Sequence, residues 1–128
     1  VARLAQALHS LPAARLEPIQ TAYIRAERLA EREQAAAKLD PTLLGEDAER
    51  EVADALGEVE PELAASLESG DFEAAVEAAA RLGPILDRFF DEVLVMAEDR
   101  AVRENRLRLL LDVRDTLRQL GDLAQIPR

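Results

Sequence analysis

The sequence has no cysteine, no tryptophan and a single histidine, His9. Without cysteine, neither disulfides nor thiolate metal sites can form, which fits a reducing cytosol, and we expect a cytoplasmic protein. No aspartate follows His9 closely, and neither a glycine-rich phosphate loop nor a cluster of metal ligands is present. No apolar run approaches the roughly 18 residues of a membrane span. We therefore expect no catalytic residue, metal or cofactor in this chain, and no membrane partner.

Glycine (5) and aromatic residues (three phenylalanines and one tyrosine) are also scarce, whereas alanine and leucine together exceed a third of the 128 residues. This composition favours helices and makes strands unexpected. The length is that of one domain with a core of its own. We predict an all-α fold, a single helical bundle of about five to seven helices over residues 1–128. Because the chain begins at Val1 and not at methionine, we expect a fragment of a larger chain.

Apolar residues at helical spacing predict helices over residues 3–11, 18–38, 46–59 with a continuation to 69, 71–82 and 101–120. Proline and glycine punctuate this pattern. Pro18 is expected to begin the second helix, Pro61 to break or kink the third, and Gly83-Pro84 to stop the fourth.

The stretch from Phe89 to Leu111 carries the strongest signal in the chain. It opens with Phe89 and Phe90, continues with the apolar run 93–97, and passes through a polar interruption into the last helix. On a helical wheel that helix is apolar over roughly 200°; its apolar residues are Val102, Leu107, Leu109, Leu110, Leu111, Val113, Leu117 and Leu120. A helix of this kind packs on more than one side, so we expect it at the centre of the bundle.

This stretch, FFDEVLVMAEDRAVRENRLRLLL, resembles the C-terminal anticodon-binding domain of the bacterial glycyl-tRNA synthetase β subunit, a helical domain of the DALR type. The matching positions are Phe89-Phe90-Asp91, Val93, Val95-Met96-Ala97, Asp99, Arg103, Asn105-Arg106-Leu107 and Leu109-Leu110. The same domain type also forms the C-terminal end of arginyl-tRNA synthetases. An anticodon-binding domain of that enzyme is therefore the alternative. The segment 23–28 is similar too, although Ile24 and Arg28 stand where the family usually has lysine and asparagine.

The resemblance implies tRNA as the partner, of the glycine-specific kind, together with the synthetase α subunit, and it implies no DNA. It also implies that aminoacylation takes place elsewhere, with the glycine-activating site on the α subunit. ATP and magnesium would then belong to the parent enzyme, a glycine–tRNA ligase, and not to this chain.

Five arginines are the candidate tRNA contacts. Arg25, Arg28 and Arg32 lie on one stripe of the long helix, and Arg25 and Arg32 have no acidic residue three or four positions away. RNA phosphates or carboxylates of the acidic middle segment could compensate these charges. Arg114 and Arg118, one turn apart near the C-terminus, are the other two. Tyr23 offers a ring on which a base could stack, with burial as the alternative.

A second group of residues is expected to build the fold rather than contact RNA: Phe89, Phe90, Arg103, Asn105, Arg106 and Leu107. Arg103 and Arg106 are predicted to brace the core, against Asp91 or Asp99. Contact of these two arginines with RNA remains the alternative.

The net charge of −10 is unevenly distributed along the chain. Residues 40–99 carry three basic against eighteen acidic residues, whereas residues 1–39 and 100–128 are each slightly basic. Two interpretations follow: the terminal helices form a weakly basic RNA-binding face, or the acidic middle is simply a solvated surface. A third use of the acidic helices is docking of a partner subunit, which makes a helical protein-interaction domain the alternative function.

Overall fold

The computed structural model describes residues 2–126, which form six α-helices and two short 3-10 helices. The elements are α1 (Ala2–Ser10), α2 (Ala13–Arg32), η1 (Pro41–Leu43), α3 (Asp47–Ser69), α4 (Phe72–Ala80), α5 (Leu82–Glu92), α6 (Arg100–Arg118) and η2 (Leu123–Gln125). Within the described part no strand occurs, and no helix there is long and apolar enough to cross a membrane. The predicted all-α bundle is confirmed.

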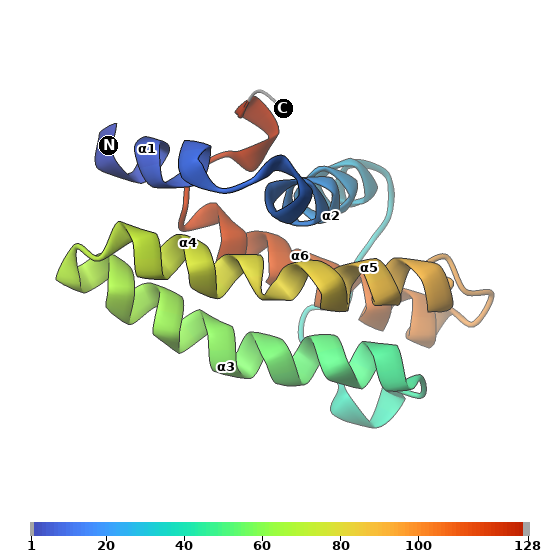
Figure 1. Cartoon of the computed structure of the whole chain (residues 1–128). Coiled ribbons are helices and arrows are strands. Elements are labelled where there is room, and N and C mark those ends of the chain that lie inside the picture. Colours follow the sequence, from blue (N-terminus) through green and yellow to red (C-terminus); the bar gives the residue numbers. More distant parts are fainter. Residues whose placement is uncertain (1, 127–128) are drawn as a thin grey trace.

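The helices pack as a hairpin with further helices laid against it (Figure 1). The long helix α3 runs along one side of α4 and α5, which follow one another almost in line in the opposite direction. Helix α6 packs against both α2 and α3, and α1 lies on α4. The last helix therefore is the central rod that its wide apolar arc predicts, with Leu109, Leu110, Val113 and Leu117 buried in the core.

The second helix differs from the prediction at both ends. It begins at Ala13 and contains Pro18, because Leu16 and Ile19 on either side of the proline are buried and hold that turn in the bundle. It ends at Arg32 rather than near Lys38. Residues 33–40 leave the helix because their backbone bonds to α6: the amide of Ala36 donates to the carbonyl of Glu104 at 3.0 Å.

The break expected at Pro61 and the stop expected at Gly83-Pro84 are also absent from the structure. Helix α3 continues through Pro61 without a break, from Asp47 to Ser69. The turn between α4 and α5 lies at Arg81, so Gly83 and Pro84 fall in the first turn of α5 instead of stopping α4. Proline is well suited to a first turn, where its missing N–H has no intrahelical partner to lose. A Cβ on Gly83 would meet the Cβ of Pro18 at 3.4 Å, so glycine keeps α2 and α5 close here.

Short polar side chains fix where the later helices begin. Asp71 accepts a hydrogen bond from the amide of Ala74 at the start of α4, and Asp99 accepts one from the amide of Val102 at the start of α6. Gly70 ends α3 in the left-handed conformation, with φ at 80°. The cap at Asp99 sets the first turn of the helix that carries most of the candidate residues.

Candidate nucleic-acid interface

Two arginines in the first half of α6 hold the segment 93–99, which connects α5 to α6. Arg106 donates to the carbonyl of Leu94 at 2.6 Å, and Arg103 donates to the carbonyls of Ala97 at 3.1 Å and Glu98 at 3.4 Å. Their acceptors in this segment are backbone carbonyls, and not the side chains of Asp91 or Asp99 against which they were expected to brace the core. Both guanidinium groups therefore donate hydrogen bonds within the protein.

Arg106 also makes an ion pair with a buried carboxylate. Its Nη2 lies 3.1 Å from Oε1 of Glu49, whose side chain is 0 % exposed, while Arg106 itself is 12 % exposed. The same Glu49 oxygen accepts a hydrogen bond from the amide of Glu46 and so helps to begin α3. Because a buried charge without its partner is strongly unfavourable, this pair joins α3, α6 and the 93–99 segment into one unit.

Asn105 holds a second connecting segment. Its Oδ1 accepts from the amide of Asp40 at 2.8 Å, and its Nδ2 donates to the carbonyl of Asp40 at 3.1 Å. An asparagine can satisfy both backbone groups of one residue in this way, which explains why it is buried at this position. With the Ala36–Glu104 bond, Asn105 ties residues 33–40 along α6.

The remaining residues predicted to build the fold are placed as expected. Phe89 is fully buried and Leu107 nearly so, and the ring of Phe90 meets that of Phe89 edge-on, with 5.4 Å between the centroids. The guanidinium of Arg25 lies 4.5 Å from the centroid of Phe90. Arg25 is exposed, but its guanidinium also packs α2 against α5 through this cation–π contact.

The second half of α6 presents a different arrangement where it packs on α2. We call the charged residues of the two helices here the α2–α6 seam: Glu27, Arg28, Arg32, Arg114 and Arg118. Oε1 of Glu27 accepts from Arg114 at 3.0 Å and from Arg118 at 2.7 Å. Arg114 also bonds to Asp115 at 2.8 Å. Arg118 is 53 % exposed, so its guanidinium can reach a ligand from solvent.

Tyr23 lies beneath this seam rather than on it. Its ring is 1 % exposed, so burial, the alternative prediction, holds in the structure and no face is open for a base to stack on. Its hydroxyl oxygen accepts a hydrogen bond from Nε of Arg118 at 3.3 Å. This bond, with the nearby negative charge of Glu27, raises the pKa of the Arg118 guanidinium. Tyr23 thus positions Arg118.

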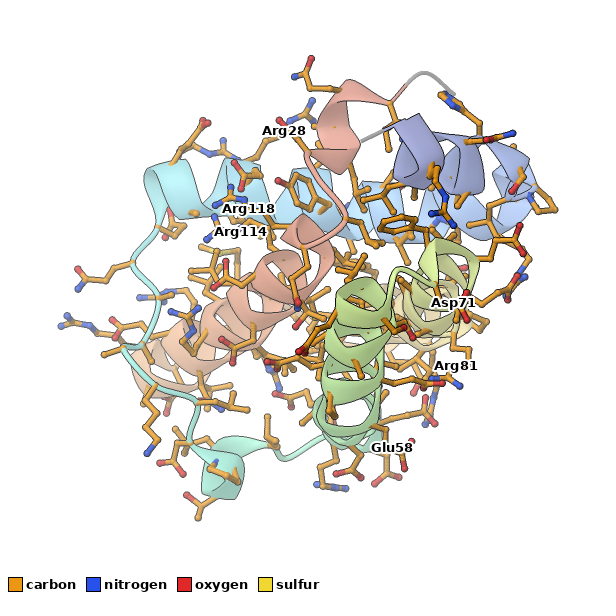
Figure 2. The ribbon with its side chains drawn as sticks, turned by 90° about the vertical axis from the view of Figure 1, so that its left-hand side faces the viewer. Arg28, Glu58, Asp71, Arg81, Arg114 and Arg118 are labelled. Atoms are coloured by element: carbon orange, nitrogen blue, oxygen red, sulfur yellow. The ribbon has the colours of Figure 1, made fainter. Side chains whose placement is uncertain are left out.

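Arg28 and Arg32 are exposed, and neither forms an ion pair with any residue in the part of the chain that the structure describes. The acids of the middle segment therefore do not compensate the charges of these two arginines, although that was one of the two interpretations. Figure 2 shows Arg28, Arg114 and Arg118 in one region of the molecule, over α2 and α6, with Glu58, Asp71 and Arg81 in another, over α3 to α5. Arg28 of α2 thus lies in the same region of the molecule as Arg114 and Arg118 of α6.

Two acidic side chains that hold these arginines, Glu27 and Glu49, were not predicted as their partners. Glu27 and Glu49 each hold arginines that follow them by dozens of residues: the bond from Arg106 to Glu49 spans 57 positions and that from Arg114 to Glu27 spans 87. For Glu27 a signal existed, because its four-residue spacing from Tyr23 places both on the same face of α2. Within residues 2–126 no group of three or more histidine or acidic side chains could hold a metal ion.

The chain is similar to known proteins over most of its length. It is 40% identical over 90 residues to the glycine–tRNA ligase beta subunit of Methylobacillus flagellatus, which covers 70% of this chain and 13% of that protein. The corresponding proteins of Moorella thermoacetica and Anaeromyxobacter dehalogenans are 41% identical over 108 residues (84% of this chain, 16% of theirs) and 44% identical over 91 (71% and 13%). The chain thus spans about a seventh of the length of these relatives.

The family comparison agrees with the fold and with the residues described above. The model of the DALR anticodon binding domain matches residues 19–127, a range that begins in α2 and includes every residue of the α2–α6 seam. The resemblance drawn from residues 89–111 is thereby confirmed. With its helical bundle, its central α6 and this match, the chain belongs to the DALR anticodon-binding domain family.

Proposed function

We propose that this chain binds the anticodon stem-loop of tRNA at the α2–α6 seam, as part of a glycine–tRNA ligase β subunit. The observation that carries the proposal is the pair Arg28 and Arg32, exposed and without an acidic partner in the described chain, on the same helix whose Tyr23 and Glu27 hold the exposed Arg118. Family membership supports the class of ligand, and the names of the relatives support glycine over arginine as the amino acid.

The seam offers the kind of group that recognises a phosphate backbone. Arginine presents a rigid fork of donors that matches phosphate oxygens, and an exposed guanidinium loses little on exchanging water for phosphate. In Arg118, Nε and Nη2 are held by Tyr23 and Glu27, which leaves Nη1 to donate outward. Contacts of this type fix the position of the RNA, and side chains on adjoining loops would read the splayed bases.

The charge of the remaining surface limits where RNA can approach. On the far side of α6, a hollow of about 380 Å³ between α3 and α6 is lined by Glu60, Asp112 and Asp115, and burial raises the pKa of Asp112 there. Asp112 and Asp115 are already paired with Arg108 and Arg114, and no lysine or arginine of the described chain lines the hollow, so it offers phosphate no basic group. RNA therefore approaches α6 from the side of α2.

The test compares two triple variants with the same change in net charge. The seam variant is R28Q/R32Q/R118Q, and the matched control is R50Q/R81Q/R88Q, whose arginines lie on α3 to α5 and pair with Asp47, Glu62, Glu51 and Glu92. With three or four phosphate contacts, the log–log slope of tRNA affinity against salt should be about −2 to −4, and the seam variant should lose roughly 0.7 to 0.9 of slope per contact.

The control variant is expected to keep both its affinity and its slope. Equal losses in the two variants would mean that only net charge matters, and a salt-independent affinity of the unmodified protein would remove phosphate binding altogether. The partner subunit, ATP and magnesium are assigned by the same proposal to the complete ligase, with this chain taking no part in the chemical step.

A further inference from the structure

Six charged side chains of alternating sign form a continuous row between α6 and α2. In order, from the hollow between α3 and α6 to the α2–α6 seam, they are Asp112, Arg108, Asp115, Arg114, Glu27 and Arg118. Ion pairs join successive members, with nitrogen–oxygen distances of 3.0, 3.5, 2.8, 3.0 and 2.7 Å. The three acids and three arginines cancel in charge, so the row is neutral as a whole and ends at the seam with Arg118.

Arg114 lies inside this row, and each nitrogen of its guanidinium already has a partner there. Nε and Nη2 donate to Oδ1 of Asp115 at 3.1 and 2.8 Å, and Nη1 donates to Oε1 of Glu27 at 3.0 Å. The side chain of Arg114 is 17 % exposed, against 53 % for Arg118 beside it (Figure 2). A phosphate from solvent therefore meets Arg118 first, and it reaches Arg114 only by replacing bonds that this arginine already makes.

Glu27 is the acid that the two arginines share. Its Oε1 accepts from both Arg114 and Arg118. A phosphate that approaches Arg118 also approaches this carboxylate, and the repulsion between two negative charges grows as they come closer. The charge of Arg114 offsets that repulsion, because it lies 3.0 Å from the same oxygen. With Arg114 removed, Glu27 would attract Arg118 and repel the phosphate with its full charge.

No other basic group of the described chain takes over this task. Arg28 and Arg32 are exposed on α2 and form no ion pair with Glu27 or with any other described residue, and the exposed Glu31 of the same helix forms none either. At the far end of the row, Arg108 pairs with both Asp112 and Asp115. Asp115 therefore has a second cation, and Arg114 is not needed to neutralise Asp115 alone.

We propose that Arg114 is a positioning residue of the seam and not a phosphate contact: it neutralises Glu27, so that Arg118 keeps its charge for a phosphate. This inference rests on the proposed binding of tRNA at the seam, and it reassigns one of the five candidate contacts. Each phosphate contact adds about 0.7 to 0.9 to the log–log slope of affinity against salt. A residue that acts through Glu27 instead changes the affinity and leaves the slope as it is.

The experiment measures tRNA affinity against salt for single variants of the natural polypeptide that carries this sequence. Arg118→Gln should lose affinity together with the slope of one contact, about 0.7 to 0.9. Arg114→Gln should lose affinity about three- to tenfold, with a slope that changes by less than half of one contact. The matched control is Arg88→Gln, which removes an arginine that also bridges two carboxylates, Glu51 and Glu92, and it should change neither quantity.

A double-variant cycle with Glu27→Gln separates this role from support of the fold. In a protein that already carries Glu27→Gln, the further change Arg114→Gln should cost less than about twofold in affinity, because no charge remains for Arg114 to neutralise. Arg118→Gln should keep its full loss in the same background. Thermal unfolding of each variant shows whether it is folded, and the double variant gives the answer even where Arg114→Gln alone is unstable.

Three results would overturn the inference and leave tRNA binding at the seam in place. They are an unchanged affinity in Arg114→Gln, a slope lowered by a whole contact in that variant, and a loss of affinity that persists when Glu27 is uncharged. An Arg118→Gln protein with the affinity and slope of the parent would instead remove the proposed function, and this inference with it.

Discussion

The two halves of α6 carry the same residue type in opposite roles. In the first half, Arg103 and Arg106 donate to backbone carbonyls and to a buried acid, and they hold the connections that surround them. In the second half, Arg118 meets a shared carboxylate at the surface, and more than half of its side chain faces solvent. The partner that each guanidinium finds, and the water that remains around it, separate an arginine that builds the fold from one that can bind a ligand.

This difference explains why the helix can serve both purposes at once. A buried ion pair is sensitive to the loss of either partner but hardly responds to salt, because ions do not reach it. An exposed pair contributes little to stability and exchanges partners readily. Variants in the first half should therefore change the free energy of unfolding, and variants in the second half should change tRNA affinity.

The largest effect is expected from Arg106→Met. It leaves the carboxylate of Glu49 buried without a partner, and loss of one member of a buried pair costs about 3–5 kcal/mol of the free energy of unfolding. Urea unfolding followed by far-UV circular dichroism measures this. The double variant with Glu49→Gln should recover part of the loss, because it removes the stranded charge. An Arg106→Met protein as stable as the parent would contradict the division of α6.

Asn105→Ala should come next. It removes both side-chain hydrogen bonds to the backbone of Asp40. Because Asp40 is exposed and water can replace the lost partner, each bond contributes about 0.5–1.5 kcal/mol to the free energy of unfolding. Hydrogen exchange of the Ala36 amide, which bonds to Glu104 in the same segment, should become faster. The control is Gln119→Ala at the exposed end of α6, for which neither measurement should change. Unchanged exchange in Asn105→Ala would show that Asn105 does not hold residues 33–40.

Glu27→Gln tests how the arginines in the second half of α6 are held in the free protein. Glu27 neutralises Arg114 and Arg118 in the free protein, so a phosphate competes with it for the same donors. Removing its charge should raise tRNA affinity about two- to fivefold and steepen the salt dependence. Glu31→Gln, an equal change in charge one turn further along α2, should have a smaller effect. A fall in affinity for Glu27→Gln would instead assign Glu27 to positioning the arginines for RNA.

The smallest effect concerns Asp40, in the segment that Asn105 holds. Hydrogen bonds from the hydroxyl and the amide of Thr42 lower the pKa of the Asp40 carboxyl. A carboxyl with a lowered folded pKa contributes stability above its unfolded pKa, and this contribution is lost as the pH falls through the folded value. In Thr42→Val the pKa should move back towards its ordinary value in an NMR titration, and the two proteins should become equally stable in acid.

The sequence predicts much of the fold because its signals are local. Apolar spacing predicts five of the six α-helices and the central place of α6, but it misses α5, because Gly83-Pro84, expected as a stop, lies in the first turn of that helix. The end of α2 could not be predicted, because hydrogen bonds from residues 36 and 40 to α6 replace the helical ones. The sequence already separates Arg103 and Arg106 from Arg114 and Arg118, but spacing along the chain does not reveal Glu49 and Glu27, the distant partners that hold Arg106 and the second pair.

The position of Tyr23 has a practical consequence. The chain has one tyrosine and no tryptophan, so its intrinsic ultraviolet emission comes almost wholly from a ring beneath the α2–α6 seam, hydrogen-bonded to Arg118. The unmodified molecule therefore contains its own optical reporter at the place where a nucleic acid would change the surroundings of that guanidinium, and no dye or label has to be attached to follow it.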